Sequence, residues 1–221
     1  MGLPRVLGFK LAKHIERFIT RPFKDPVKAQ EKFLMDLIRK NEGTIYGKHH
    51  DFSSIRSIRQ FQERCPITNY NDYEPYIEKI LDGKADVLTT YEQVYWGQTS
   101  GTSGVPKLIP IVTESFKTVN ISQFIAIISY IAEDPRNNSR FLDGKSCFFV
   151  ANPVLRQERN GMPVGYGTGL FSSIRGGSQF WKKILDHWVY IPVHLNKVKD
   201  LEKRYYMLAK ETINKDIRLF G

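Results

Sequence analysis

The stretch from Gln98 to Lys107 (QTSGTSGVPK) constrains this chain more than any other. Its last nine residues hold four hydroxyl side chains, two glycines and one lysine, and they lie between two apolar stretches. Glycine lets a backbone wrap closely around a ligand. Ser and Thr hydroxyls can join backbone N–H groups in donating to phosphate oxygens, and the lysine adds a mobile positive charge. The stretch therefore predicts a loop that binds the triphosphate of a nucleotide.

Two common nucleotide-binding motifs do not describe this loop. A Walker A loop ends in Gly-Lys-Ser/Thr, whereas Lys107 follows Pro106. A Rossmann fingerprint, G-x-G-x-x-G, is absent from the stretch. The alternative is a flexible Ser/Gly surface loop, but a solvated linker does not require a Pro-Lys ending between two strands. The order of hydroxyl residues, glycines, proline and lysine favours a phosphate-binding role.

The charge of the chain allows two interpretations. The 33 basic residues exceed the 23 acidic ones, which gives a formal net charge of +10. Half of this excess lies in the first 32 residues, which hold eight basic and three acidic side chains. An anionic partner, such as a membrane surface or a nucleic acid, is one interpretation. The other is a solvated helix face, which we prefer because no nucleic-acid motif is recognised. We expect no nucleic-acid partner.

The cysteines and the apolar segments indicate where the protein resides. Cys65 and Cys147 are the only cysteines and form no C-x-x-C motif, so a reducing cytoplasm is expected and a disulfide framework is not. No stretch approaches the length of a membrane-spanning helix, and the N-terminus lacks the apolar core of a signal peptide.

The five histidines show no metal-ligand spacing, so no metal site is predicted.

Helices alternate with strands along the chain, which predicts an α/β fold. Helical spacing predicts a first helix from about Leu7 to Arg21 and a long helix capped by Thr113. That long helix is expected to bury Phe116, Val119, Phe124, Ile127, Ile128 and Ile131. Further helices are predicted near 33–41, at 57–64, from Thr68 to Leu81 with an interruption at Pro75, at 178–185, and after a cap at Asn196. Strands are predicted at 87–89, 94–96, 107–112, 147–150 and 188–191.

The domain prediction follows from these patterns. Residues 1–26 are expected to form a basic amphipathic N-terminal helix, and residues 27–221 a partial ATP-binding domain. Only about four or five strands are visible, and the chain stops at Gly221 shortly after a helix. If the chain is incomplete, apolar surface that should meet further strands would be exposed, and low solubility is expected.

Three segments, taken in order, are similar to one protein family. Gln30–Tyr46 (QEKFLMDLIRKNEGTIY) is similar to an opening helix that ends in an Asn-x-x-Thr-x-Tyr turn. Phe61–Gly83 (FQERCPITNYNDYEPYIEKILDG) is similar to the next block, and Thr99–Pro110 to a phosphate loop with a trailing Leu-Ile-Pro. On these segments the chain resembles the auxin-responsive promoter family, the acyl acid–amido synthetases of the adenylate-forming superfamily. The similarity is good over residues 28–132 and looser beyond them.

The resemblance implies both a fold and a reaction. The fold would be an incomplete N-terminal domain of the adenylate-forming ligases, in which helices alternate with a mixed, mainly parallel sheet. A carboxylate would attack the α-phosphate of ATP, and the amine of an amino acid would then attack the acyl-adenylate, with Mg²⁺ assisting. The partners would be a small carboxylic acid and an amino acid.

The motif match also implies roles for loop residues. Hydroxyl contacts would come from Ser100, Thr102 and Ser103, and Lys107 would neutralise the β- and γ-phosphates. The full set of candidate ATP-binding residues is Thr99, Ser100, Gly101, Thr102, Ser103, Gly104 and Lys107. Candidates for acyl-substrate contacts are Phe171, Ser172, Ser173 and Arg175.

Other motifs of the family are not found in this chain. They are the adenine motif, the magnesium-binding glutamate, the ribose-binding aspartate and the mobile C-terminal domain. We therefore assign no catalytic residue and no magnesium ligand, and expect the chain alone to be incomplete and inactive. The alternative is a short or degenerate family member that is not catalytic and retains only the phosphate-binding loop.

Overall fold

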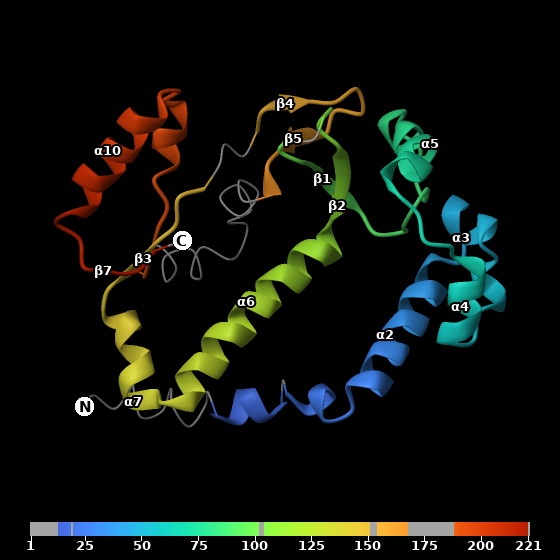
Figure 1. Cartoon of the computed structure of the whole chain (residues 1–221), viewed down its shortest axis with the longest axis horizontal. Helices are drawn as coiled ribbons and strands as arrows, with labels where there is room; N and C mark the ends of the chain where they lie inside the picture. The colour runs from blue at the N-terminus through green and yellow to red at the C-terminus, as the bar shows by residue number, and fades with distance from the viewer. Residues whose placement is uncertain (1–12, 19, 102–103, 151–153, 168–187, 221) are drawn as a thin grey trace.

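The protein has a mixed α/β fold, which we describe from a computed structural model covering residues 13–18, 20–101, 104–150, 154–167 and 188–220 (Figure 1). Residues 13–18 are helical. The other helices are η1 (Arg21–Lys24), α2 (Pro26–Asn41), α3 (Ile45–His49), η2 (Phe52–Ser54), α4 (Ile58–Arg64), α5 (Tyr70–Leu81), α6 (Thr113–Glu133), α7 (Pro135–Asn138), η3 (Ser139–Asp143), η4 (Val193–Lys197) and α10 (Leu201–Thr212). The strands are β1 (Gln93–Gln98), β2 (Leu108–Val112), β3 (Lys145–Cys147), β4 (Arg156–Gln157), β5 (Pro163–Gly165), β6 (Val189–Tyr190) and β7 (Ile217–Phe220).

The described strands form two sheets. The first has the order β2-β1-β5-β4, and the second has the order β6-β3-β7. β1 pairs with β2 in antiparallel and with β5 in parallel orientation, and β4 pairs with β5 in antiparallel orientation. In the second sheet, β3 is parallel to both of its neighbours. The prediction of helices with a mixed sheet is therefore confirmed. The four-stranded sheet is not mainly parallel, because two of its three strand pairs are antiparallel, and only the three-stranded sheet is parallel throughout.

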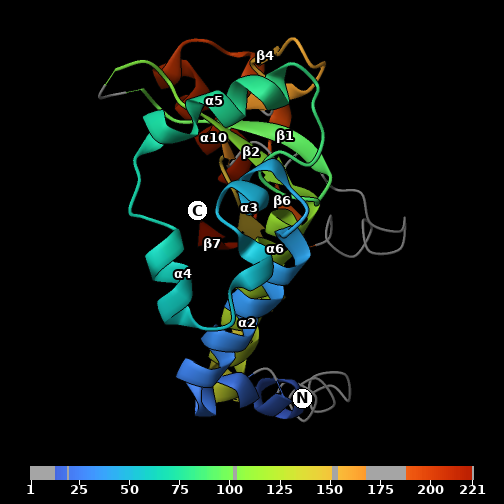
Figure 2. The same cartoon turned by 90° about the vertical axis from the view of Figure 1, so that its right-hand side faces the viewer.

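Three hydrophobic clusters hold these elements together. In the first, Ile77 and Leu81 of α5 pack on Trp96 of β1 and Val164 of β5. The second joins α2 to η2 and the residue after it through Ile38, Phe52 and Ile55, and the third joins β3, η4 and α10 through Cys147, Leu195 and Leu208. Figures 1 and 2 both place α5 beside the four-stranded sheet. Both cysteines are free thiols.

The N-terminus of α5 corrects the predicted cap and interruption. Asn69, and not Thr68, caps the helix: its side chain accepts from the Asn71 N–H at 2.9 Å, and the Asp72 carboxylate accepts from the Asn69 N–H at 2.7 Å. This capping box satisfies N–H groups that the first turn leaves unpaired. Pro75 lies inside a continuous helix. Its missing N–H removes only the bond to the carbonyl of Asn71, an exposed residue in the first turn that water can reach.

Other boundaries differ from prediction because local hydrogen bonds decide them. Residues 87–89 form no strand, since the carbonyls of Asp86 and Val87 accept from the N-terminus of α3, each at 2.9 Å. Asp200 caps α10 through a 2.7 Å bond from the Lys203 N–H, whereas Asn196 lies within η4. Two predictions are nearly right: α6 starts with Thr113 as its first residue, and β6 spans two residues of the predicted 188–191. The predicted strand 147–150 is wrong over most of its length, because pairing with β7 places β3 at Lys145–Cys147. The predicted helix at 178–185 lies outside the described residues.

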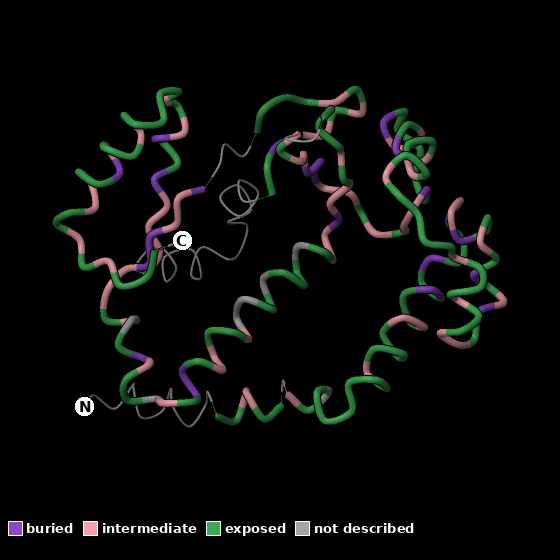
Figure 3. Tube along the Cα trace, viewed as in Figure 1, coloured by how far each residue is buried: buried purple, intermediate pink, exposed green. Residues whose placement is uncertain are grey.

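The long helix α6 is exposed where burial was expected. Val119 and Ile127 are exposed, as are Ile121 and Tyr130, and among the described side chains of the predicted face only Ile131 is buried. The main contacts of α6 are with β2 at its start and α7 at its end. Figure 3 shows the same pattern, with buried residues near the end of α6 and in the sheets. The side chains of Phe116 and Phe124 are outside the described part. None of the helices that the structure describes is long and apolar enough to cross a membrane.

The cap of α5 gives a direct test of this local structure. We expect Asn69→Ala to lower the free energy of unfolding by about 1 kcal/mol, because the first turn loses its cap. Thr68→Ala is the matched control. It removes only an exposed hydroxyl contact to Tyr73 and should cost less than about 0.5 kcal/mol. Urea unfolding of both variants measures the difference. If Thr68→Ala lowered the free energy of unfolding by more than Asn69→Ala does, Thr68 would be the cap, as the sequence predicted.

Candidate functional site

The predicted phosphate loop connects two strands of one hairpin. β1 and β2 pair from Gln93–Val112 to Gln98–Leu108, and residues 99–107 form the connection. Thr99 closes its base: the Thr99 N–H donates to the Lys107 carbonyl at 3.1 Å, and the Thr99 hydroxyl accepts from the Lys107 N–H at 2.9 Å. The predicted order of strand, loop and strand is thereby confirmed, and Thr99 has a structural role in addition to the predicted contact.

The glycines give the loop its turn. Gly101 and Gly104 both have positive φ, +69° and +142°, and the Gly104 N–H donates to the Gly101 carbonyl at 3.0 Å. A Cβ at Gly101 would lie 2.9 Å from Cγ of Pro106, closer than real Cβ contacts come. Only glycine fits this position without a shift. The hydroxyl of Ser100 is on an exposed residue next to the turn, and Thr102 and Ser103 lie outside the described residues.

Lys107 lies at the end of the loop against an aromatic ring of α5. Its Nζ is 5.3 Å from the centre of the Tyr70 ring. The Tyr70 hydroxyl donates to the Leu108 carbonyl and accepts from the Leu108 N–H, each at 3.1 Å. Sequence reasoning did not name Tyr70 as a site residue. The contact joins residues 38 positions apart and exists only because α5 packs on the sheet.

A second cation lies next to the base of the loop. The Arg156 guanidinium donates to the Gln98 side chain, and it also forms an ion pair with Glu158 at 2.8 Å. The nearby turn between β4 and β5 is fastened to α5 by Arg159, which pairs with Glu78 at 2.5 Å and Asp82 at 3.1 Å. The bond to Glu78 raises the pKa of Arg159 above its usual value. These contacts fix α5 relative to the loop.

A cavity of about 540 Å³ lies between α5 and the second half of the loop. The cavity is lined by residues of α5 between Tyr70 and Leu81, by residues 105–107 of the loop and by Leu108 of β2. Glu74 and Glu78 line it together with Lys107, and the Glu78 carboxylate is paired with Arg159. Ser100 and Gly104 are exposed on the loop and do not line this cavity.

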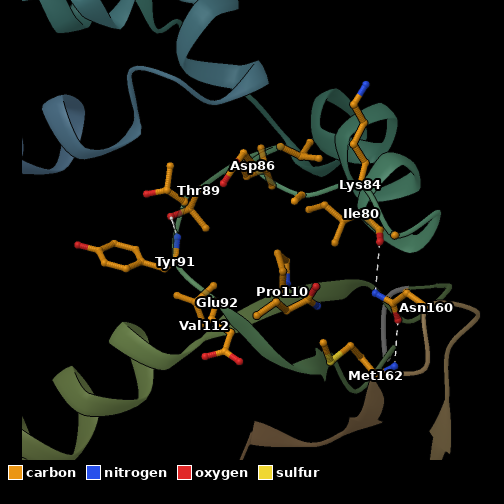
Figure 4. Close-up of a pocket in the computed structure, with 16 residues that line it drawn as sticks. Ile80, Lys84, Asp86, Thr89, Tyr91, Glu92, Pro110, Val112, Asn160 and Met162 are labelled. Carbon is orange, nitrogen blue, oxygen red and sulfur yellow. Dashed lines mark hydrogen bonds between the residues drawn. The ribbon is translucent and has the colours of Figure 1, made fainter.

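A second cavity, of about 370 Å³, lies beyond the opposite end of α5 (Figure 4). Its lining includes Ile80, Pro110, Val112 and Met162, and none of the candidate loop residues. Asn160 crosses its edge, donating to the Ile80 carbonyl at 3.3 Å and accepting from the Met162 N–H at 3.1 Å. The sequence analysis named no residue of this cavity, because apolar side chains of this kind are typical of ordinary core packing.

The described residues contain no group of three or more His, Cys, Asp and Glu side chains that could hold a metal ion. His49 and His50 instead contact the Tyr76 hydroxyl at 2.6 Å and the Arg64 carbonyl at 2.8 Å. The acyl-substrate candidates Phe171, Ser172, Ser173 and Arg175 lie outside the described residues. The predicted site is thus represented by Thr99, Ser100, Gly101, Gly104 and Lys107, which the hairpin brings together.

Comparison with known proteins identifies relatives of the chain. An indole-3-acetic acid-amido synthetase, GH3.2 of Arabidopsis thaliana, is 30% identical over 100 residues, which are 44% of this chain and 18% of that protein. The jasmonoyl–L-amino acid synthetase JAR6 of Nicotiana attenuata is 27% identical over 161 residues, which are 72% of this chain and 26% of that protein. The chain thus spans only a small part of these relatives.

A solved structure shares the fold. It is the GH3.15 acyl acid amido synthetase, which superposes with a TM-score of 0.72 at 20% identity over 95% of this chain and 36% of that chain. The α/β fold is therefore that of part of this acyl acid amido synthetase structure. The family described as "GH3 family N-terminal domain" matches residues 15–210. Since this match covers most of its length, the chain belongs to the GH3 family of acyl acid–amido synthetases.

Proposed function

We propose that this chain is the N-terminal part of an ATP-dependent acyl acid–amido synthetase, and that its loop 99–107 binds the triphosphate of ATP. The observation that carries the proposal is a hydroxyl- and glycine-rich loop that ends in Lys107 and is held between β1 and β2 of a GH3-family fold. In the proposed reaction, a carboxylate attacks the α-phosphate and displaces pyrophosphate. The amine of an amino acid then attacks the acyl carbon of the acyl-adenylate, which forms the amide and releases AMP.

Each loop residue has a role in this proposal. The hydroxyl groups of Ser100, Thr102 and Ser103 donate hydrogen bonds to phosphate oxygens. The turn at Gly101 and Gly104 lets backbone N–H groups come close to them. Lys107 neutralises the β- and γ-phosphates and the leaving pyrophosphate, where most of the charge develops. Thr99 holds the base of the loop closed and is a further contact candidate.

Mg²⁺ commonly accompanies ATP and neutralises its phosphates. The described residues do not fit it, since they bring together no group of three or more His, Cys, Asp and Glu side chains that could hold a metal ion. We therefore assign no magnesium ligand to this chain and no step to the ion.

The proposed substrates follow from the names of the relatives. One is an indole-3-acetic acid-amido synthetase, and another is a jasmonoyl–L-amino acid synthetase. Their shared chemistry is a small carboxylic acid joined to an amine, and we propose this pair of substrate classes here, without a nucleic-acid partner. The free thiols of Cys65 and Cys147 support a cytoplasmic location.

Replacing the loop lysine tests the ATP site. We expect Lys107→Ala to weaken ATP binding by about tenfold or more, because a charged hydrogen bond to phosphate is lost. Lys117→Ala is the matched control, since Lys117 pairs with Glu114 on the exposed surface of α6. Calorimetric titration of the 221-residue chain with ATP gives both affinities. Unchanged affinity in a folded Lys107→Ala variant would contradict the proposal.

Replacing Gly101 tests the shape of the loop. Gly101→Ala forces a side chain into a positive-φ position and against Pro106, so we expect a displaced loop and weaker ATP binding. The matched control is Gly161→Ala in the turn between β4 and β5, where φ is +78° and a Cβ meets nothing within 4 Å. It should cost about 1–2 kcal/mol of unfolding free energy and leave ATP affinity unchanged. Equal effects of the two variants on ATP affinity would argue against a loop-specific role.

A further inference from the structure

We propose that Tyr70 is a positioning residue for Lys107, and that it sets the affinity of the loop for polyphosphate by holding the ammonium group at the end of the loop. This inference rests on the proposed function of Lys107 as a phosphate-binding residue. Tyr70 itself belongs to α5, outside the loop. It reaches the loop through two separate interactions, one made by its hydroxyl and one by its ring.

The hydroxyl of Tyr70 fixes the backbone that follows the lysine. Among the described strands, β2 lies at the edge of its sheet, with β1 as its one neighbour. Leu108 begins this strand directly after Lys107, and both its N–H and its carbonyl are bonded to the Tyr70 hydroxyl at 3.1 Å. One side-chain oxygen thus acts as donor and acceptor to the same residue. The stem of the loop is thereby tied to α5.

The ring of Tyr70 holds the charged end of the side chain. Lys107 Nζ lies 5.3 Å from the ring centre, within the range of a cation–π interaction. No ion pair of Lys107 is present among the described residues, whereas the Lys117 ammonium is 2.8 Å from the Glu114 carboxylate. An aromatic face attracts a cation without cancelling its net charge. Lys107 is therefore restrained and still carries a full charge for an anion.

The position of Tyr70 is itself well determined. It is the first residue of α5, directly after the Asn69 cap. Further along α5, Ile77 and Leu81 pack on the buried Trp96. A ring fixed in this way can lower the conformational entropy that a free lysine side chain loses when it binds phosphate. The hydroxyl acts on the backbone at Leu108, whereas the ring acts on the ammonium, so the effect of the ring on binding must pass through Lys107.

The contact itself is tested without any ligand. The side-chain methylene protons of Lys107, assigned by their loss in Lys107→Met, should show an upfield ring-current shift in NMR spectra. Tyr70→Leu should abolish this shift, and Tyr70→Phe, which keeps the ring, should retain it. A Lys107 spectrum that is the same in wild type and Tyr70→Leu would overturn the proposal, because the ring would then not contact the lysine.

The consequence is tested by titration with ATP and with inorganic tripolyphosphate. We expect Tyr70→Leu to weaken the affinities for ATP and for tripolyphosphate by about two- to fivefold, the range of an exposed cation–π interaction. Tyr70→Phe, which keeps the ring, should retain most of the wild-type affinity. In the Lys107→Met background, Tyr70→Leu should have no more effect than Tyr70→Phe, because only the hydroxyl contact to Leu108 is then left to lose. An equal loss in both backgrounds would overturn the proposal, since Tyr70 would then act on the fold and not through the lysine.

A matched pair elsewhere in the chain serves as the control. Lys40 Nζ lies 5.5 Å from the centre of the Tyr91 ring, so Tyr91→Leu removes a similar interaction away from the loop. It should leave both affinities unchanged, and far-UV circular dichroism checks that every variant is folded. If the wild-type chain binds neither ATP nor tripolyphosphate, the proposed function fails and the role of Tyr70 fails with it. Binding by wild type with an unaltered Tyr70→Leu variant overturns only the role of Tyr70.

Discussion

The burial of Trp96 beneath α5 is the interaction on which the rest of this structure depends. Its side chain is fully buried, and it lies in β1 between the helix and the neighbouring strand β5. Its indole N–H donates to Asn160 at 3.3 Å, and Asn160 in turn donates to the Ile80 carbonyl at the end of α5. A large aromatic side chain contributes much apolar area, and its single polar group has a partner here. One residue therefore joins α5, β1 and the turn between β4 and β5.

This packing connects the fold to the candidate site. With α5 held on the sheet, Tyr70 at its start reaches both the first residue of β2 and the ammonium of Lys107. The loop is closed at its base by Thr99 and turned at Gly101 and Gly104. A rigid helix on one side and a hairpin on the other thus frame an exposed loop with one restrained positive charge. Such a preorganised, positively charged turn suits a phosphate group better than a flexible linker would.

The long helix α6 exposes apolar side chains, and the chain spans only part of the relatives that it matches. The matches cover 18% and 26% of two curated relatives and 36% of a solved structure. Val119 and Ile127 follow the spacing of a buried helix face, yet they are exposed in the described chain. The spacing of apolar residues indicates that a helix has an apolar side. It does not indicate whether another element packs on that side, and the main contacts of α6 are at its two ends.

The sequence by itself determined the family, the strand–loop–strand order around residues 99–107 and most helices, because these depend on local spacing and on short motifs. It did not determine the cap at Asn69, the continuity of α5 through Pro75 or the lack of a strand at 87–89, because each depends on which backbone groups find partners. The division at residues 26 and 27 stays a prediction. Only the tertiary structure brought Tyr70 to Lys107, since a contact between residues so far apart forms only once α5 has packed on Trp96.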